Sequence, residues 1–138
     1  SKPLPFLRTM ASAASDGHPE TIFHKIVSKD IPSTKVYEDE VAYAFRDISP
    51  AAPTHVLVIP KDRDGLVGLQ TSEDRHKETL GHLLLVANKV AVSEGIAETG
   101  YRVVINAGPQ GCQSVDYLHL HVIGGKQLTW PPGTGDVE

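Results

Sequence analysis

One short segment near the C-terminus constrains the fold more than any other part of the chain. From Tyr117 to Val122, ring side chains alternate with aliphatic ones. Successive side chains of a β-strand point to opposite faces, so Tyr117, His119 and His121 are predicted to share one face of a strand. The aliphatic residues between them share the other face, which we interpret as the core side. The pattern predicts a sheet that carries two imidazoles about 7 Å apart on one face.

The residues before this strand favour a binding loop. Residues 106–111 are rich in Gly and Pro, and Gln113 and Ser114 follow. Such a loop can bring backbone N–H groups close to an anion. On spacing alone the histidine pair is a catalytic or phosphate-binding surface, a zinc site or a structural pair. Zinc needs a third and usually a fourth ligand, and only His55 is eligible, since Cys112 has no cysteine partner. We therefore predict no metal.

Composition narrows the function classes. A chain of 138 residues suits one domain. The net charge of −4 gives no basic surface, so nucleic acid is not an expected partner. No apolar run approaches the roughly 20 residues of a membrane helix, so no membrane is expected either. The single cysteine fits a reducing compartment. We expect a cytoplasmic or nuclear protein, or an organellar one if residues 1–9 are the remnant of a transit peptide.

The order of predicted elements favours an antiparallel α+β domain. Residues 1–19 are predicted to be a flexible tail, residues 20–133 the domain and residues 134–138 a C-terminal tail. A short helix is expected over residues 20–29, with Pro19 at its entry. A long helix is expected from an N-cap at Ser72 to about Gly95. The predicted strands cover residues 36–39, 41–48, 55–60, 101–106 and 117–122.

The long helix has one apolar stripe, which we predict to be buried. Its members are spaced at three and four residues along the helix. They are Leu80, Leu83, Leu84, Ala87, Val90 and Ala91. The isolated histidines of this helix, His76 and His82, are predicted to lie at the surface.

Many short blocks of the sequence form one ordered pattern across residues 20–133, the span of the predicted domain. The blocks are residues 21–23, 29–32, 44–50, 52–55, 58–61, 113–115, 119–121, 124–127 and 130–133. In these blocks, taken in order, the sequence resembles the histidine triad (HIT) family, in particular its Hint branch. Residues 61–66 and 108–112 resemble plant members most.

This resemblance implies a HIT-like fold and a homodimer. The expected fold is a five-stranded antiparallel sheet with one long and one short helix. In the dimer the two sheets join, the long helices pack together, and the C-terminal arm carries Trp130 to the neighbour's site. The implied activity is hydrolysis or transfer of purine nucleoside monophosphates, AMP or GMP, carried on amine or sulfate leaving groups. The resemblance implies no cofactor and no metal.

The resemblance also assigns roles to residues. His119 would be the nucleophile that forms a nucleotidyl intermediate. His121, Gln113 and Ser114 would contact the phosphate, with Ser114 hydrogen-bonded to the leaving group. Asp47 would accept both ribose hydroxyls. The remaining implied site residues are Asn106 beside the phosphate and ribose, His55 in support, an apolar base slot of Phe23, Ile26, Ile31, Phe45 and Ile48, and Arg46 and Cys112 near the nucleotide.

One position departs from the family pattern. The first triad position is Tyr117 instead of histidine, and Asp116 precedes it where the family usually has an aromatic residue. A phenol cannot supply a second imidazole to a proton relay. The alternative function is therefore a catalytically weakened nucleotide-binding or scaffold protein.

Overall fold

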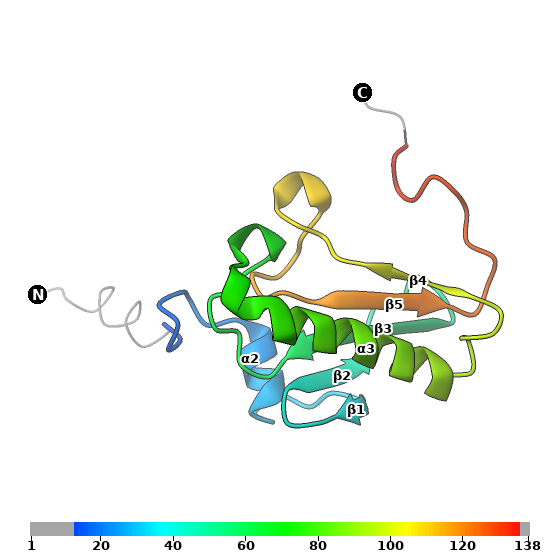
Figure 1. The fold of residues 1–138 in the computed structure, drawn as a ribbon. Helices are drawn as coiled ribbons and strands as arrows, with labels where there is room; N and C mark the ends of the chain where they lie inside the picture. The colour runs from blue at the N-terminus through cyan, green and yellow to red at the C-terminus, as the bar shows by residue number, and fades with distance from the viewer. Residues whose placement is uncertain (1–12, 136–138) are drawn as a thin grey trace, which may run out of the picture.

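The computed structural model describes residues 13–135, and it is an α+β domain built on one five-stranded antiparallel sheet (Figure 1). The strand order is β1-β2-β3-β5-β4. The strands are β1 Lys35–Glu38, β2 Ala42–Arg46, β3 Thr54–Pro60, β4 Tyr101–Val104 and β5 Leu120–Gly124. The α-helices are α2 Ile22–Val27 and α3 Lys77–Ser93, and the 3-10 turns are η1 Leu69–Thr71, η2 Asp74–His76 and η3 Pro109–Gly111. The predicted fold class is confirmed.

Two hydrophobic clusters lie on the two faces of the sheet. Strand β3 is buried along its whole length and pairs with β2 on one side and β5 on the other. Helix α3 covers one face, where it packs on Leu118, Leu120 and Val122 (Figure 1). Tyr117 belongs to the other cluster, with Phe23 of α2. The predicted alternation of faces from Tyr117 onward is therefore confirmed.

The strand that carries the histidines begins later than predicted. Strand β5 begins at Leu120, not at Tyr117. The chain before it leaves the sheet, because the Leu118 N–H donates to the Leu66 carbonyl at 2.8 Å instead of to a neighbouring strand. Since the carbonyl of Tyr117 makes no strand pair, it is free to accept a side-chain hydrogen bond.

Helix α2 is shorter than predicted and begins differently. Thr21, not Pro19, precedes it, and Thr21 Oγ1 accepts the Phe23 N–H at 3.2 Å. In return His24 Nδ1 accepts the Thr21 N–H at 2.9 Å. This is a capping box in which histidine replaces the usual Glu or Gln. The cap sets the helix phase that turns Phe23 and Ile26 into the second cluster.

The start of the long helix was predicted wrongly. Ser72 ends the η1 turn and does not cap α3, which begins at Lys77 after a second 3-10 turn. His76 is not a surface residue: it is 1% exposed. Its Nδ1 accepts the Glu73 N–H, and its Nε2 lies 2.9 Å from the Asp64 carbonyl. His82 is half-buried and lies 2.7 Å from Asp39. Both histidines therefore stabilise turns.

The buried stripe of α3 is confirmed except at one position. Leu83, Ala87, Val90 and Ala91 are buried, Leu80 packs on the core, and Val86 joins them. Leu84 is 52% exposed, so its predicted burial is wrong.

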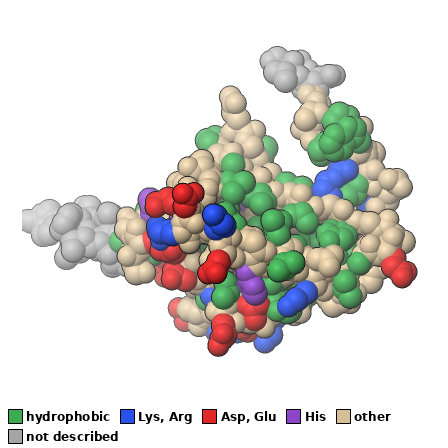
Figure 2. Space-filling model, in the orientation of Figure 1, with side chains coloured by type: hydrophobic (Ala, Val, Ile, Leu, Met, Phe, Trp, Pro, Cys, Tyr) green, Lys and Arg blue, Asp and Glu red, His purple; other side chains and the backbone are tan. Residues whose placement is uncertain are grey.

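The outer face of α3 is apolar. Leu84, Leu85 and Val92 are between 52% and 66% exposed. Figure 2 shows hydrophobic side chains gathered over the middle of the face that α3 covers. Among the described residues, no helix is long and apolar enough to cross a membrane.

The two ends of the described chain behave differently. Residues 13–19, assigned to a tail from the sequence, lie against the domain, where Asp16 pairs with Arg63. Residues 1–12 and 136–138 of the predicted tails lie outside the described residues. The C-terminal arm runs away from the sheet (Figure 1), and its Trp130 is 81% exposed.

Candidate active site

His119 presents one ring nitrogen as a nucleophile. Its Nδ1 lies 2.7 Å from the carbonyl oxygen of Tyr117. A carbonyl oxygen can only accept, so Nδ1 carries the proton and Nε2 keeps its lone pair. The ring is buried, with Phe23 edge-on at 5.2 Å between centroids. Burial holds the pKa of His119 below its ordinary value, so the ring is neutral at pH 7.

A chain of hydrogen bonds fixes the tautomer of His121. The Ala51 N–H donates to His55 Nδ1 at 2.9 Å, so His55 carries its proton on Nε2. That Nε2–H donates to His121 Nδ1 at 2.9 Å. His121 therefore carries its proton on Nε2. Burial first, and then the nearby rings of His119 and His55, lower the pKa of His121 to about 4.

The chain of hydrogen bonds ends on an unpaired donor. His121 Nε2 is buried, and among the described residues it has no hydrogen-bond partner. Leaving such a donor unpaired costs about 1–3 kcal/mol. Its ring lies 5.1 Å from the ring of His119, centroid to centroid. A nucleophilic nitrogen and an unpaired N–H donor thus lie side by side.

A mainly apolar cavity of about 600 Å³ adjoins this pair. Phe23 connects the two, because its ring touches His119 and also lines the cavity. The predicted site residues that line it are Phe23, Ile26, Phe45, Arg46, Asp47, Ile48 and Ser114. Ile31 does not line it but packs on the same cluster, and Ile48 is 98% exposed at its rim. The cavity has the size and polarity for a flat ring with a polar end.

Asp47 supplies the polar end of the cavity together with Ser114. One carboxylate oxygen accepts the Ser49 N–H at 2.8 Å, and the other lies 3.4 Å from His55 Nε2. Arg46 turns away and donates two hydrogen bonds to Glu94. Asp47 is therefore the anionic group of this cavity that is free to accept from a ligand.

Three further residues predicted for the site, Asn106, Cys112 and Gln113, do not line the cavity. The Gln113 amide donates to the carbonyls of Val67 and Val115 and accepts the Gly108 N–H, so it holds the loop together. Cys112 is exposed in a left-handed conformation (φ 64°). Asn106 is half-buried just after β4.

Tyr117 contributes its backbone to the site, not its phenol. The side chain is fully buried, edge-on to Phe23 and His24, and its hydroxyl donates to the Pro60 carbonyl. Burial raises the pKa of this phenol above its ordinary value. The ring is therefore a packing element, while the carbonyl fixes the tautomer of His119.

Three side chains form the one cluster with metal-ligand spacing that was found among the described residues. Ligand atoms of Asp47, His55 and His121 lie within 4.8 Å of one another. A metal on His55 Nε2 would move the proton to Nδ1, where it would face the Ala51 N–H, donor against donor. The donor set does not fit a metal and fits a hydrogen-bond chain.

Sequence reasoning missed Arg63 and its partner Asp16. Arg63 is 2% exposed and donates to both oxygens of Asp16, 47 residues away in the chain. A buried arginine has no periodic sequence pattern, and Asp16 was assigned to a tail. Only the structure reveals this pair.

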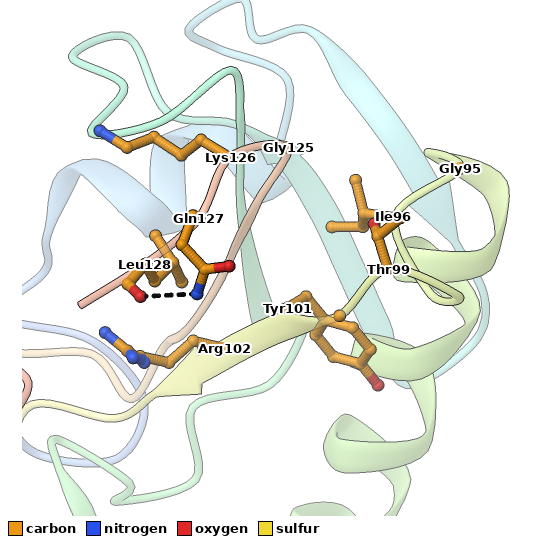
Figure 3. A pocket seen from close by; sticks show the side chains of 10 residues that line it. Gly95, Ile96, Thr99, Tyr101, Arg102, Gly125, Lys126, Gln127 and Leu128 are labelled. Carbon is orange, nitrogen blue, oxygen red and sulfur yellow. Dashed lines mark hydrogen bonds between the residues drawn. The ribbon is translucent and has the colours of Figure 1, made fainter. Parts of the chain in front are cut away.

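A second cavity of about 530 Å³ lies beside the start of β4, the edge strand of the sheet. It is formed where the end of α3, the start of β4 and residues 125–128 meet (Figure 3). Arg102 and Lys126 line it, and none of the predicted site residues does.

This chain is similar to one protein-family model, to two plant proteins and to a bacterial crystal structure. The family model described as HIT domain matches residues 28–128. The "14 kDa zinc-binding protein" of Zea mays is 64% identical over 113 residues, 82% of this chain and 88% of that protein. "Adenylylsulfatase HINT1" of Arabidopsis thaliana is 58% identical over 123 residues, 89% of this chain and 83% of that protein. The crystal structure of a HIT family hydrolase from Legionella pneumophila Philadelphia 1 has a TM-score of 0.79 at 46% identity, covering 83% of this chain and 100% of that one.

Proposed function

This chain belongs to the HIT domain family, and from that premise we propose that it cleaves AMP or GMP from amine or sulfate leaving groups through a nucleotidyl-His119 intermediate. The observation that carries the proposal is the 2.7 Å hydrogen bond between His119 Nδ1 and the Tyr117 carbonyl, which leaves Nε2 as a free nucleophile. The Arabidopsis relative named adenylylsulfatase supports the sulfate side of the proposal.

The first step forms a bond from His119 Nε2 to the α-phosphorus. The bond from phosphorus to the leaving group breaks, and the leaving group departs with that electron pair beside Ser114, which lines the cavity. An amine leaving group takes up one proton from solvent as it departs. A water molecule then attacks the phosphorus and gives up one proton, and the bond from phosphorus to Nε2 breaks, which returns the electron pair to Nε2. Splitting one displacement into two lowers the barrier of each.

His121 stabilises the charge that develops on the phosphoryl oxygens. Its unpaired Nε2–H is the donor for one of them. In the free protein the pKa of His121 is about 4, so the ring meets the substrate in the neutral form with this tautomer. The phosphate satisfies the donor that the free protein leaves unpaired.

The cavity selects a purine ribonucleotide. The apolar walls hold the base, and the Asp47 carboxylate accepts the two ribose hydroxyls. A site built to accept from hydroxyls discriminates against a sugar that lacks them.

A homodimer completes the site in this proposal. Apolar side chains on the outer face of α3 and the free edge of β4, the last strand in the sheet order, are available for pairing. Trp130 packs little on its own chain, being 81% exposed. The arm that carries it then reaches the neighbouring site.

The test is turnover of an AMP-amine conjugate by EDTA-treated protein. We expect His119→Ala to lower kcat by more than about 1000-fold. His82→Ala is the matched control, since His82 lies on α3, pairs with Asp39 and does not line the cavity, and it leaves kcat unchanged.

Two outcomes would count against the proposal. AMP binding without turnover in the wild type favours a nucleotide-binding or scaffold protein, the alternative that Tyr117 suggests. Undiminished turnover in His119→Ala means that another group is the nucleophile.

A further inference from the structure

Arg63 is the one deeply buried cation found among the described residues, and the proposed mechanism does not use it. It lies just after β3 and is 2% exposed. Burying a guanidinium is costly unless its donors are satisfied. Five hydrogen bonds satisfy all five of them: two to the Asp16 carboxylate, and one each to the carbonyls of His18, Pro19 and Asp116.

Two of the contacts of Arg63 fall on the segment that holds His119. Its Nη1 donates to the Asp116 carbonyl at 2.8 Å, and its guanidinium lies over the Tyr117 ring, 5.8 Å from the centroid. The next carbonyl along the chain, that of Tyr117, fixes the tautomer of His119. Since β5 begins only at Leu120, no strand pairing holds this segment in place.

Asp16 fixes the orientation of Arg63. Its two oxygens accept from Nε and Nη2 at 2.7 and 2.8 Å, a bidentate pair that sets the plane of the guanidinium. The same carboxylate accepts the Gly65 N–H at 2.9 Å. The hydrogen bonds from Arg63 are the main cause that holds the pKa of Asp16 well below its usual range, and the Gly65 N–H adds to the effect. The pair is therefore charged throughout the physiological range.

We propose that Arg63 is a positioning residue for His119, and that Asp16 of the N-terminal segment completes the active site by holding Arg63 in place. The inference rests on the proposed function in that His119 is taken as the nucleophile. Residues 13–19 are then a working part of the enzyme, although they precede the predicted domain.

The informative variant is Asp16→Asn. Replacing one carboxylate oxygen by an NH₂ group places a donor against the guanidinium and breaks the bidentate pair. A small misplacement of a reacting group costs about 100-fold, so we expect kcat to fall by about 10- to 100-fold. KM should stay within about threefold, because neither Asp16 nor Arg63 lines the nucleotide cavity.

Asp64→Asn is the matched control. It makes the same chemical change in the Asp64–Arg75 pair, which is half exposed and contacts neither Asp116 nor Tyr117. We expect kcat and KM to be unchanged in this variant.

A second measurement does not depend on turnover. The ¹⁵N NMR shifts of the His119 ring report its tautomer. We expect the Nδ1–H form alone in the wild type and in Asp64→Asn, and a mixture of both tautomers in Asp16→Asn. If Asp16→Asn does not fold, Asp16→Glu takes its place, because it keeps the charge and displaces the carboxylate by one methylene.

The outcomes distinguish a failure of the positioning role of Arg63 from a failure of the proposed function. A folded Asp16 variant with unchanged kcat and the Nδ1–H tautomer alone would overturn the positioning role. If the wild type turns over no nucleotide conjugate, the proposed function fails, and the tautomer of His119 in the variant still decides whether Arg63 positions it.

Discussion

The protonation of each histidine in the site follows from one hydrogen-bond partner. A carbonyl oxygen holds the proton on Nδ1 of His119, and the N–H of Ala51 keeps the proton off Nδ1 of His55. Sequence reasoning could place His119 and His121 on one face, because alternation along a strand is local. It could not derive the chain of hydrogen bonds, because that depends on how the loop before β3 brings Ala51 to His55.

Among single substitutions, we predict that Tyr117→His has only a limited effect on kcat. The carbonyl that holds His119 survives any side chain, and the native phenol is fully buried and bonded to the Pro60 carbonyl. The substitution should therefore raise kcat by less than about 100-fold, the low end of what a positioned acid–base group supplies.

Tyr117→Phe is the control for this prediction. It keeps the ring and leaves the Pro60 carbonyl without its donor, so stability should fall by about 1–3 kcal/mol with little change in kcat. A wild type that is inert until Tyr117→His restores turnover would contradict the prediction and favour a binding protein.

The sequence predicted the type of each helix and strand better than the residues at which it begins and ends. The stripe of α3 and the continuous apolar run of β3 are strong local patterns, so both elements were expected. Ser72 resembled an N-cap, but two 3-10 turns separate it from α3, and the buried His76 sets the start of the helix. Ring packing and turn geometry of this kind depend on distant partners such as Asp64, which local patterns do not reveal.

For the structural elements, we make one prediction about the C-terminal arm. Truncation after Gln127 removes Trp130, which is exposed and outside the core. We expect a folded dimer whose ranking of substrates changes among conjugates that differ only in the leaving group. Size-exclusion chromatography with light scattering checks the dimer, and kcat/KM over the series checks the ranking. An unchanged ranking would mean that the arm does not line the site.

Across the whole molecule, buried histidines couple stability to pH. Burial lowers the pKa of His24, His119 and His121 below the ordinary value of 6.5. Below pH 6.5 the unfolded chain binds more protons than the folded one, so the stability these groups contribute is lost as the pH falls. For His121 this loss extends to about pH 4.

We therefore predict that the thermal unfolding temperature falls steadily from pH 7 to pH 4.5. Asp16 and Asp39, whose folded pKa values lie below 3.8, add their loss only at lower pH. Calorimetry over this range checks the prediction, and His121→Gln should make the fall shallower. A flat profile between pH 7 and pH 4.5 would show that these histidines are not buried in the neutral form.

Direct detection of the covalent intermediate tests the central claim, that His119 is the nucleophile. Wild-type protein mixed with an AMP-amine conjugate is quenched in alkali within one turnover, and its peptides are analysed by mass spectrometry. The account predicts one adenylyl group on His119 of the wild type and none on the peptides of His119→Ala. Turnover with no adenylylated peptide, or an adenylyl group on His121 instead, would contradict it.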